Sequence, residues 1–294
     1  MSQAEQQSHV RNSDGFILVS FKKRKHKGKK IDVQSVHFGS TFTKRLSPDS
    51  SSASIESFFR KYTDTKSDLT SSPFFNEITE KVFPILKQAE ISRIICLGLG
   101  RLSECPISRH QLAFIFCLKE YINLQDRIKF FDPIFSQLEI KILQHLDGVV
   151  LKENLEGKYL SNEKTLFYLP HCPKQITNNI LWKNWRLELL NNTIIISNSF
   201  ESILISNPRR FLDISANFIR KIAEYCDEIS LPINYKHADI FNDISLHLFN
   251  TEALRLKEEQ FWEATEPLYN EENLEFITRE IQDTLKIGDD DFHN

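Results

Sequence analysis

The sequence predicts an α/β protein with a mostly parallel β-sheet and helices on both faces. A short apolar run, Ile94–Leu97, has strand length and ends at Gly98 and Gly100, which permit a tight turn. Ile107–Ile122 follows a proline, is long enough for several helical turns and is apolar almost all round at its centre, which indicates burial. A second apolar run follows at Ile128–Phe131. Strand, glycine turn, buried helix and strand form the first βαβ unit of a Rossmann-like sheet.

The segment before this unit divides into an arm and a helix. Residues 1–70 carry 13 Lys or Arg against 7 Asp or Glu and few apolar residues, which predicts a disordered basic arm. Within it, Gly15–Val19 suits an added strand. Lys22–Lys30 suits a nuclear-import signal or a phosphate-binding arm, and equally a solvated tail. Ser72 before Pro73 predicts the start of a covering helix, and Pro84 predicts a break in it.

The same periodicities predict the rest of an α/β domain over residues 71–250. The expected helices are Gln137–Leu146, Lys174–Leu190 and Pro208–Glu228. The expected strands are Gly148–Leu151, Thr165–Leu169, Thr193–Ile196 and, with weaker alternation, Phe241–Phe249. Residues 251–294 carry 4 Lys or Arg against 13 Asp or Glu, which predicts an acidic tail with a helix near Leu256–Ala264 and a disordered end.

Composition limits the compartment and the partners. Residues 71–250 carry 20 cationic and 20 acidic side chains, so we do not expect a nucleic-acid-binding face on the fold. The five cysteines suit the reduced thiols of a cytoplasmic or nuclear protein. No run approaches the roughly 18 apolar residues of a spanning helix, and the N-terminus has no apolar signal core. We therefore expect neither membrane insertion nor secretion, and a cytoplasmic and nuclear location.

Unusual polar residues gather where the expected strands end. In a parallel sheet these ends share one edge, and open α/β sheets bind ligands at that edge. The candidate set is Gly98, Gly100, Ser103, Asp132, His171, Cys172, Asn198 and Ser199. The sequence therefore predicts a ligand site at the carboxyl edge of the sheet, with the ligand left open.

Two interpretations of the first four residues remain. Gly98, Gly100 and Ser103 are spaced like a dinucleotide fingerprint whose third glycine is replaced. Asp132 could then bind the ribose hydroxyls of a nicotinamide nucleotide or of S-adenosylmethionine. Alternatively, the glycines only permit a turn, and Asp132 only caps the helix that starts near Ser136.

The remaining candidates favour structure over chemistry. His171 and Cys172 are adjacent and point apart in an extended segment, so neither cysteine catalysis nor a zinc site shared with Cys105 is favoured. Trp182 and Trp185 are three apart, which suits a shared helical face. Such a pair could stack on a base, but it more often fills a core or an interface.

Several separate segments, taken together, resemble the sensitivity-to-red-light-reduced protein family over residues 90–205. The matching segments are Cys96–Gly100, Cys105-Pro106, Arg109–Ala113, Asp132–Phe135 with Glu139, Asn154–Lys158, Thr165–Cys172, Asn178–Trp182 with Asn184-Trp185, and Asn198–Phe200. The resemblance implies a eukaryotic regulatory protein, associated in plants with light signalling and circadian rhythm, in animals with the clock and haem biosynthesis, and in fungi with microtubule-related growth. It implies no established reaction and no set of catalytic residues.

Three classes of function follow from these observations. The first is a regulatory protein that acts through a protein partner. The second is a methyltransferase-like or nucleotide-dependent enzyme that uses the carboxyl edge and binds a nucleotide or S-adenosylmethionine. The third, nucleic-acid binding through Lys22–Lys30, is disfavoured because the domain itself is neutral.

Overall fold

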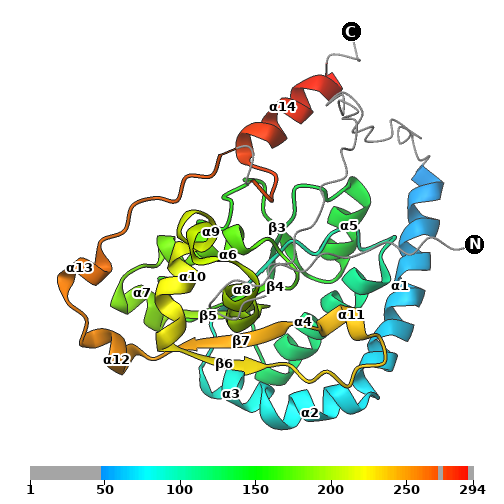
Figure 1. Ribbon diagram of the computed structural model, residues 1–294. Helices are drawn as coiled ribbons and strands as arrows, with labels where there is room; N and C mark the ends of the chain where they lie inside the picture. Colours follow the sequence, from blue (N-terminus) through cyan, green and yellow to red (C-terminus); the bar gives the residue numbers. More distant parts are fainter. Residues whose placement is uncertain (1–47, 271–273, 291–294) are drawn as a thin grey trace, which may run out of the picture. The chain divides into compact units, whose positions relative to one another are not determined.

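The structure is a computed structural model that describes residues 48–270 and 274–290 (Figure 1). Its sheet has seven strands in the order β3-β2-β1-β4-β5-β7-β6. The strands are β1 (Arg93–Leu97), β2 (Lys129–Phe131), β3 (Val149–Val150), β4 (Thr165–Leu169), β5 (Thr193–Asn198), β6 (Cys226–Ser230) and β7 (Ile244–Phe249). All neighbouring strands are parallel except β7, which runs antiparallel to β5 and to β6. The expected mostly parallel, Rossmann-like α/β fold is confirmed.

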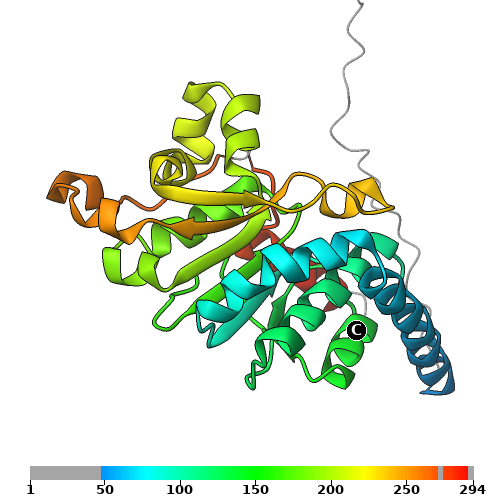
Figure 2. The same ribbon diagram turned by 90° about the horizontal axis from the view of Figure 1, so that it is seen from below.

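Helices connect the strands and lie on both faces of the sheet (Figure 2). Those of the N-terminal half are α1 (Pro48–Thr70), α2 (Pro73–Lys81), α3 (Phe83–Gln88), α4 (Pro106–Ile122) and α5 (Gln137–His145). The next are α6 (Lys174–Lys183), α7 (Leu187–Asn191), α8 (Phe200–Ser206), α9 (Arg209–Ser215), α10 (Asn217–Ile222), the short 3-10 helix η1 (Ala223–Tyr225) and α11 (Ala238–Phe241). The last are α12 (Thr251–Arg255), α13 (Glu259–Trp262) and α14 (Arg279–Asp290). Within the described ranges, none of them is long and apolar enough to cross a membrane.

The alternation of side chains along each strand divides the core into two clusters. On β1, Ile94 and Cys96 belong to one cluster, while Ile95 and Leu97 belong to the other. Successive strand residues point to opposite faces, so one short strand supplies both cores. The first cluster is covered mainly by α1 to α5, and the second mainly by α6 to α10 with α12. Two buried faces explain why the central strands are apolar at nearly every position.

The buried helix α4 begins and ends as its sequence predicts. Pro106 occupies the first turn, and Asn123 closes the helix in the left-handed conformation, with φ of 56°. Phe114 is fully buried, and its ring centroid lies 5.4 Å from that of Phe241 and 5.6 Å from that of Tyr168. The helix is therefore anchored to the sheet and to α11.

The prediction of a disordered arm over residues 1–70 is wrong for residues 48–70, because these residues form α1. Phe58, Tyr62 and Leu69 repeat at helical spacing, and all three are buried. The many serines and charged residues between them mask this stripe, because they occupy the exposed face of the helix. The predicted strand at Gly15–Val19 and the basic run Lys22–Lys30 lie outside the described residues.

The helix start at Ser72 and the break at Pro84 are confirmed. The Ser72 hydroxyl accepts a hydrogen bond from the backbone N–H of Phe75, and α2 and α3 are separate helices. The helix predicted over Lys174–Leu190 is two helices, α6 and α7, with Trp185 buried in the turn between them. The residues predicted as one helix over Pro208–Glu228 form α9, α10, η1 and the first part of β6. A short edge strand with little alternation was not recognisable from its sequence.

The helix expected near Leu256–Ala264 is present as α13, and other described residues of the acidic tail also pack on the domain. Leu254 of α12 is fully buried, and the Trp185 indole N–H donates to the Phe261 carbonyl at 2.9 Å. The hydroxyl of Tyr269 bonds to the side chains of Asn178 and Asn179, at 3.0 and 2.8 Å. These few aromatic and apolar residues anchor an otherwise acidic segment to the domain.

Replacing Phe114 with alanine tests whether α4 is buried as described. We expect Phe114→Ala to reduce the free energy of unfolding by about 3–5 kcal/mol, because the change removes a large buried ring and leaves a cavity. The control Lys119→Ala, on the same helix, should cost well under about 1 kcal/mol. Denaturant melts measure both values. Small and equal losses in the two variants would contradict the buried position of α4.

Candidate functional site

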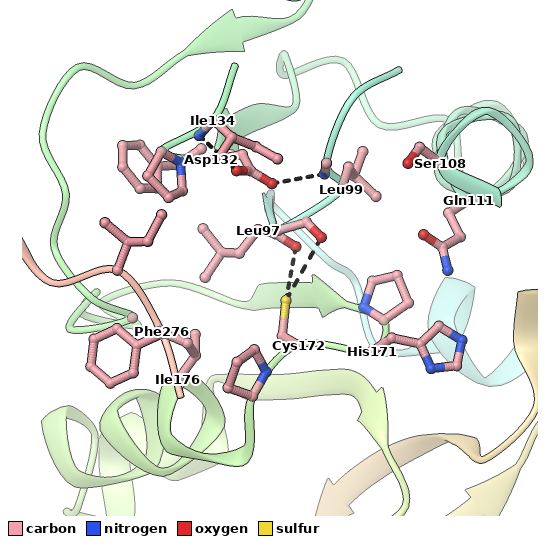
Figure 3. A pocket seen from close by; sticks show the side chains of 18 of the residues that line it. Leu97, Leu99, Ser108, Gln111, Asp132, Ile134, His171, Cys172, Ile176 and Phe276 are labelled. Carbon is pink, nitrogen blue, oxygen red and sulfur yellow. Dashed lines mark hydrogen bonds between the residues drawn. The ribbon is translucent and has the colours of Figure 1, made fainter. Parts of the chain in front are cut away.

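A pocket of about 530 Å³ opens at the carboxyl ends of β1, β2 and β4 (Figure 3). Its floor is the turn after β1, with Leu97 and Gly98, and its sides are formed by the turn after β2 and by Pro170–Pro173 after β4. The parallel register places Cys96 beside both Phe130 and Tyr168, so the three strands end close together. A pocket of this volume suits a small-molecule ligand.

Asp132 fixes the geometry of this edge. Its Oδ2 accepts the backbone N–H of Gly100 at 2.7 Å, and its Oδ1 accepts the N–H of Ile134 at 3.0 Å. The carboxylate therefore joins the glycine turn to the turn after β2 (Figure 3). Burial raises the pKa of Asp132 above its usual value, although the two backbone hydrogen bonds oppose that shift.

The two glycines meet different constraints. Gly98 has φ of 66°, and a Cβ atom there would lie 2.3 Å from the Cys172 sulfur, so no side chain fits. Gly100 also has positive φ, 74°, but a Cβ there would lie 3.5 Å from the Ser108 hydroxyl, an ordinary contact. Gly98 thus permits close packing of the turn against Cys172, whereas Gly100 is required by its backbone conformation alone.

Ser103 points away from the pocket and contacts a buried acid. Its N–H and hydroxyl donate to Oε1 of Glu139 at 3.3 and 2.6 Å, and the other oxygen of Glu139 accepts the N–H and hydroxyl of Ser136. Burial alone would raise the pKa of Glu139, but the hydrogen bonds from Ser103 and Ser136 outweigh it and hold the pKa below its usual value. Ser136, and not Asp132, caps α5. Ser103 therefore anchors the glycine turn to that helix.

His171 and Cys172 point apart, as expected for neighbours. His171 is exposed, has φ of 56°, and its Nε2 contacts the Ile240 carbonyl at 3.1 Å. The Cys172 thiol is buried and donates to the Leu97 carbonyl at 3.4 Å. Burial raises the pKa of the Cys172 thiol, with a smaller contribution from Asp132, which keeps the sulfur protonated and unreactive. His171 lines the mouth of the pocket, while Cys172 supports its floor.

Asn198 and Ser199, the candidates after β5, do not line the pocket. The Asn198 amide donates to the Cys172 carbonyl at 3.1 Å, and the Ser199 hydroxyl accepts the N–H of Ser202 as the cap of α8. The structure therefore brings Gly98, Gly100, Asp132 and His171 together, and places Ser103, Asn198 and Ser199 behind the walls.

The paired tryptophans do not share a face. Trp185 is buried and lies past the end of α6, with its ring centroid 4.9 Å from that of Phe218. Trp182 is partly buried on α6 and packs at the edge of the same cluster. Both therefore belong to the core, and neither lines the pocket.

Several pocket residues were not identified from the sequence as site candidates. Ser108 and Gln111 come from α4, Asn154 and Glu156 from the loop after β3, and Asp239 from α11. Glu275, Phe276 and Ile277 come from the acidic tail and close one side. For this last group the only signal in the sequence is a pair of apolar residues within an acidic segment.

The charge of the lining distinguishes between ligand classes. Acidic side chains line the pocket at Asp132, Glu156, Asp239 and Glu275, and none of its described lining residues is Lys or Arg. Glu156 and Glu275 form ion pairs with Lys158 and Lys174, which lie outside the lining. The pocket is therefore neutral to acidic, and it suits a neutral or cationic ligand better than a polyphosphate.

The fold and the pocket define a Rossmann-like α/β protein with a ligand-sized site at the carboxyl edge of its sheet. A comparison with known families matches residues 74–248 to the SRR1 domain. The chain belongs to the SRR1 domain family, which confirms the resemblance to the sensitivity-to-red-light-reduced proteins.

Three relatives show how far the similarity extends. An SRR1-like protein of Drosophila melanogaster is 35% identical over 243 residues, which are 81% of this chain and 86% of that protein. An SRR1-like protein of Mus musculus is 36% identical, over 48% of this chain and 57% of its own length. The Protein SENSITIVITY TO RED LIGHT REDUCED 1 of Arabidopsis thaliana is 29% identical, over 42% of this chain and 46% of its own length.

Among solved structures, the SAH-bound methyltransferase PaMTH1 of Podospora anserina is similar at 14% identity. The comparison covers 68% of this chain and 94% of that one, with a TM-score of 0.35.

Replacing Glu139 with glutamine tests the anchor of the glycine turn. We expect Glu139→Gln to reduce the free energy of unfolding by about 2–3 kcal/mol near neutral pH, because an amide nitrogen would face hydroxyl and N–H donors. The pKa of Glu139 is lowered by folding, so its contribution is present above the ordinary glutamate pKa and is lost as the pH falls below it. Denaturant melts across the acid range measure this difference.

The matched control is Glu153→Gln, an exposed acid on the loop after β3. We expect that variant to change the free energy of unfolding by no more than about 0.5 kcal/mol at any pH. A loss in Glu139→Gln that stayed constant down to strongly acidic pH would show that the carboxylate charge does not hold the turn.

Proposed function

We propose that this SRR1-family chain is a regulatory protein whose domain binds S-adenosylmethionine in the carboxyl-edge pocket. The observation that carries the proposal is the lining of the pocket, which combines the glycine turn after β1 and the acid after β2 with the absence of any described Lys or Arg. A site at this edge of an open α/β sheet is the expected place for a ligand.

The charge of the pocket lining favours S-adenosylmethionine over nucleotides that carry phosphate groups. Di- and triphosphate groups need cationic or multiple N–H partners when they leave water. The N–H of Gly100 is already bonded to Asp132, and the described residues of the lining include no Lys or Arg. S-adenosylmethionine carries a positive sulfonium and no phosphate, and Asp132 and Asp239 would favour that charge.

The strand order supplies independent support. The strand order reverses between β1 and β4, and the pocket lies at the carboxyl ends of these two strands, where open α/β sheets bind ligands. Because folds host unrelated functions, this support concerns the ligand and not a reaction. Methyl transfer is the second candidate function, and it would need an acceptor that reaches the pocket mouth near His171.

The regulated process is proposed from the family alone. The family resemblance seen in the sequence leads us to circadian and light signalling, control of haem biosynthesis and microtubule-related growth as the candidate processes, with action through a protein partner. A regulatory domain that binds S-adenosylmethionine would couple such a partner to the methylation state of the cell.

A ligand-dependent melting experiment tests the proposal. S-adenosylmethionine at 100 times its dissociation constant should stabilise the fold by about 2.7 kcal/mol, because it binds only the native state. The melting temperature should then rise by several degrees, because each kcal/mol raises it by about 2–4 °C for a domain of this size. ATP, GTP and nicotinamide nucleotides at the same concentration should produce no shift.

Two charge reversals serve as matched variants. Asp239→Lys places a cation in the pocket lining and should reduce the shift, whereas Glu188→Lys, exposed on α7, should leave it unchanged. A shift with ATP but none with S-adenosylmethionine would overturn the charge argument. No shift with any of these ligands would remove the proposed site.

A further inference from the structure

Residues 274–279, which we call the C-terminal segment, lie on one continuous surface of the domain. That surface is formed by Asn154 and Glu156 of the loop after β3 and by the first residues of α6, Lys174 and Gln175. Phe276 of the segment lines the pocket (Figure 3), and so does Ile277. The segment is neither helix nor strand until α14 begins at Arg279.

The domain holds the backbone of the segment at alternate residues. The N–H of Glu275 donates to the Gln175 side chain, the Asn154 amide donates to the carbonyl of Ile277, and the N–H of Arg279 donates to Glu156. Each of these distances is 2.9 Å. These bonds go to main-chain groups, which every peptide has. This part of the recognition therefore does not depend on the side chains of the bound peptide.

Side chains add the selectivity. Lys174 forms an ion pair with Glu275, and the side chain of Lys174 is only 14% exposed. The next residue, Phe276, packs its ring against Tyr269, with centroids 5.8 Å apart, and Ile277 faces the pocket. The resident segment thus presents an acid, an aromatic residue and an aliphatic residue in order, the first to Lys174 and the third to the pocket.

The surface presents polar side chains to the segment that lies on it. Asn154 and Gln175 are buried, and each places a side-chain amide atom against the segment. The loop that carries Asn154 and Glu156 is itself fixed, because the Asn179 amide donates to the Glu156 carbonyl and Gly157 leaves no room for a Cβ beside Ile176. With the segment bound, the amides of Asn154 and Gln175 are shielded from water and hydrogen-bonded to it, so a competing peptide has to offer the same main-chain groups.

We propose that this surface is a peptide-binding site, which the chain fills with its own C-terminal segment and which takes a partner's acid-aromatic-aliphatic segment in exchange. The site adjoins the proposed S-adenosylmethionine site, with which it shares Asn154 and Glu156, but its existence does not depend on that ligand. The tethered segment competes at an effective concentration of the order of millimolar, so a partner binds well only when its own segment is better matched or the resident one is released.

A labelled peptide with the sequence of residues 274–281 tests the site against the full chain. We compare the chain with a released variant, Glu275→Lys with Phe276→Ala, by fluorescence anisotropy. The released variant should bind the peptide about tenfold tighter than the unmodified chain, because the tethered competitor is weakened. Adding Lys174→Glu to the released variant should abolish this gain, and a peptide with lysine in place of its glutamate should then recover it.

A protease assay tests the same site without the released variant, and so it applies even if that variant folds poorly. Chymotrypsin should cut after Phe276 severalfold faster in Lys174→Glu than in the unmodified chain, and Lys174→Glu with Glu275→Lys should restore protection. A peptide that binds the released and unmodified chains equally would overturn the proposal. Failure of the charge exchange to restore either binding or protection would overturn it as well. Both readouts are taken without S-adenosylmethionine, so their failure is separate from failure of the ligand site.

Discussion

The hydrogen bonds of the Asp132 carboxylate determine the shape of the carboxyl edge. One oxygen holds the turn after β1 and the other holds the turn after β2, so two strands end in a single rigid unit. Glu139 joins the glycine turn to α5 in a similar way, by accepting hydrogen bonds from Ser103 and Ser136. The two acids thus accept the N–H groups of the turns that border the pocket, so these groups are hydrogen-bonded without a ligand.

The sequence predicted the central βαβ unit well because its signals are local. A glycine turn, a proline at a helix start and an apolar run each act within a few residues, and Gly98, Pro106 and Phe114 do what their types suggest. The edge elements were harder. In Cys226–Ser230, apolar and polar residues hardly alternate, because an edge strand buries few side chains. In α1, a short apolar stripe is difficult to recognise because serines and charged residues surround it.

The candidate site was predicted in part for a related reason. Parallel topology alone brings Gly98, Gly100, Asp132 and His171 to one edge, so strand order was sufficient to group them. It could not reveal that Ser199 caps its own helix. Nor could it reveal that Phe276 returns to the pocket from the far end of the chain, since that contact depends on tertiary packing.

The pocket and the peptide-binding surface share the C-terminal segment, and this links the two proposals physically. Phe276 and Ile277 line the pocket, while the backbone around them is held by Asn154 and Gln175. A partner that displaced the segment would therefore rebuild one wall of the pocket. Coupling of this kind is reciprocal, because each event changes the free energy of the other by the same amount.

Amide chemical shifts test the central claim, binding of S-adenosylmethionine at the carboxyl edge, most directly. In a titration of the ¹⁵N-labelled full chain, the amides of Gly98, Gly100 and Ile134 should shift and saturate together, while those of β6 stay unchanged. Shifts that saturate elsewhere, with the two glycines and Ile134 unaffected, would contradict the account.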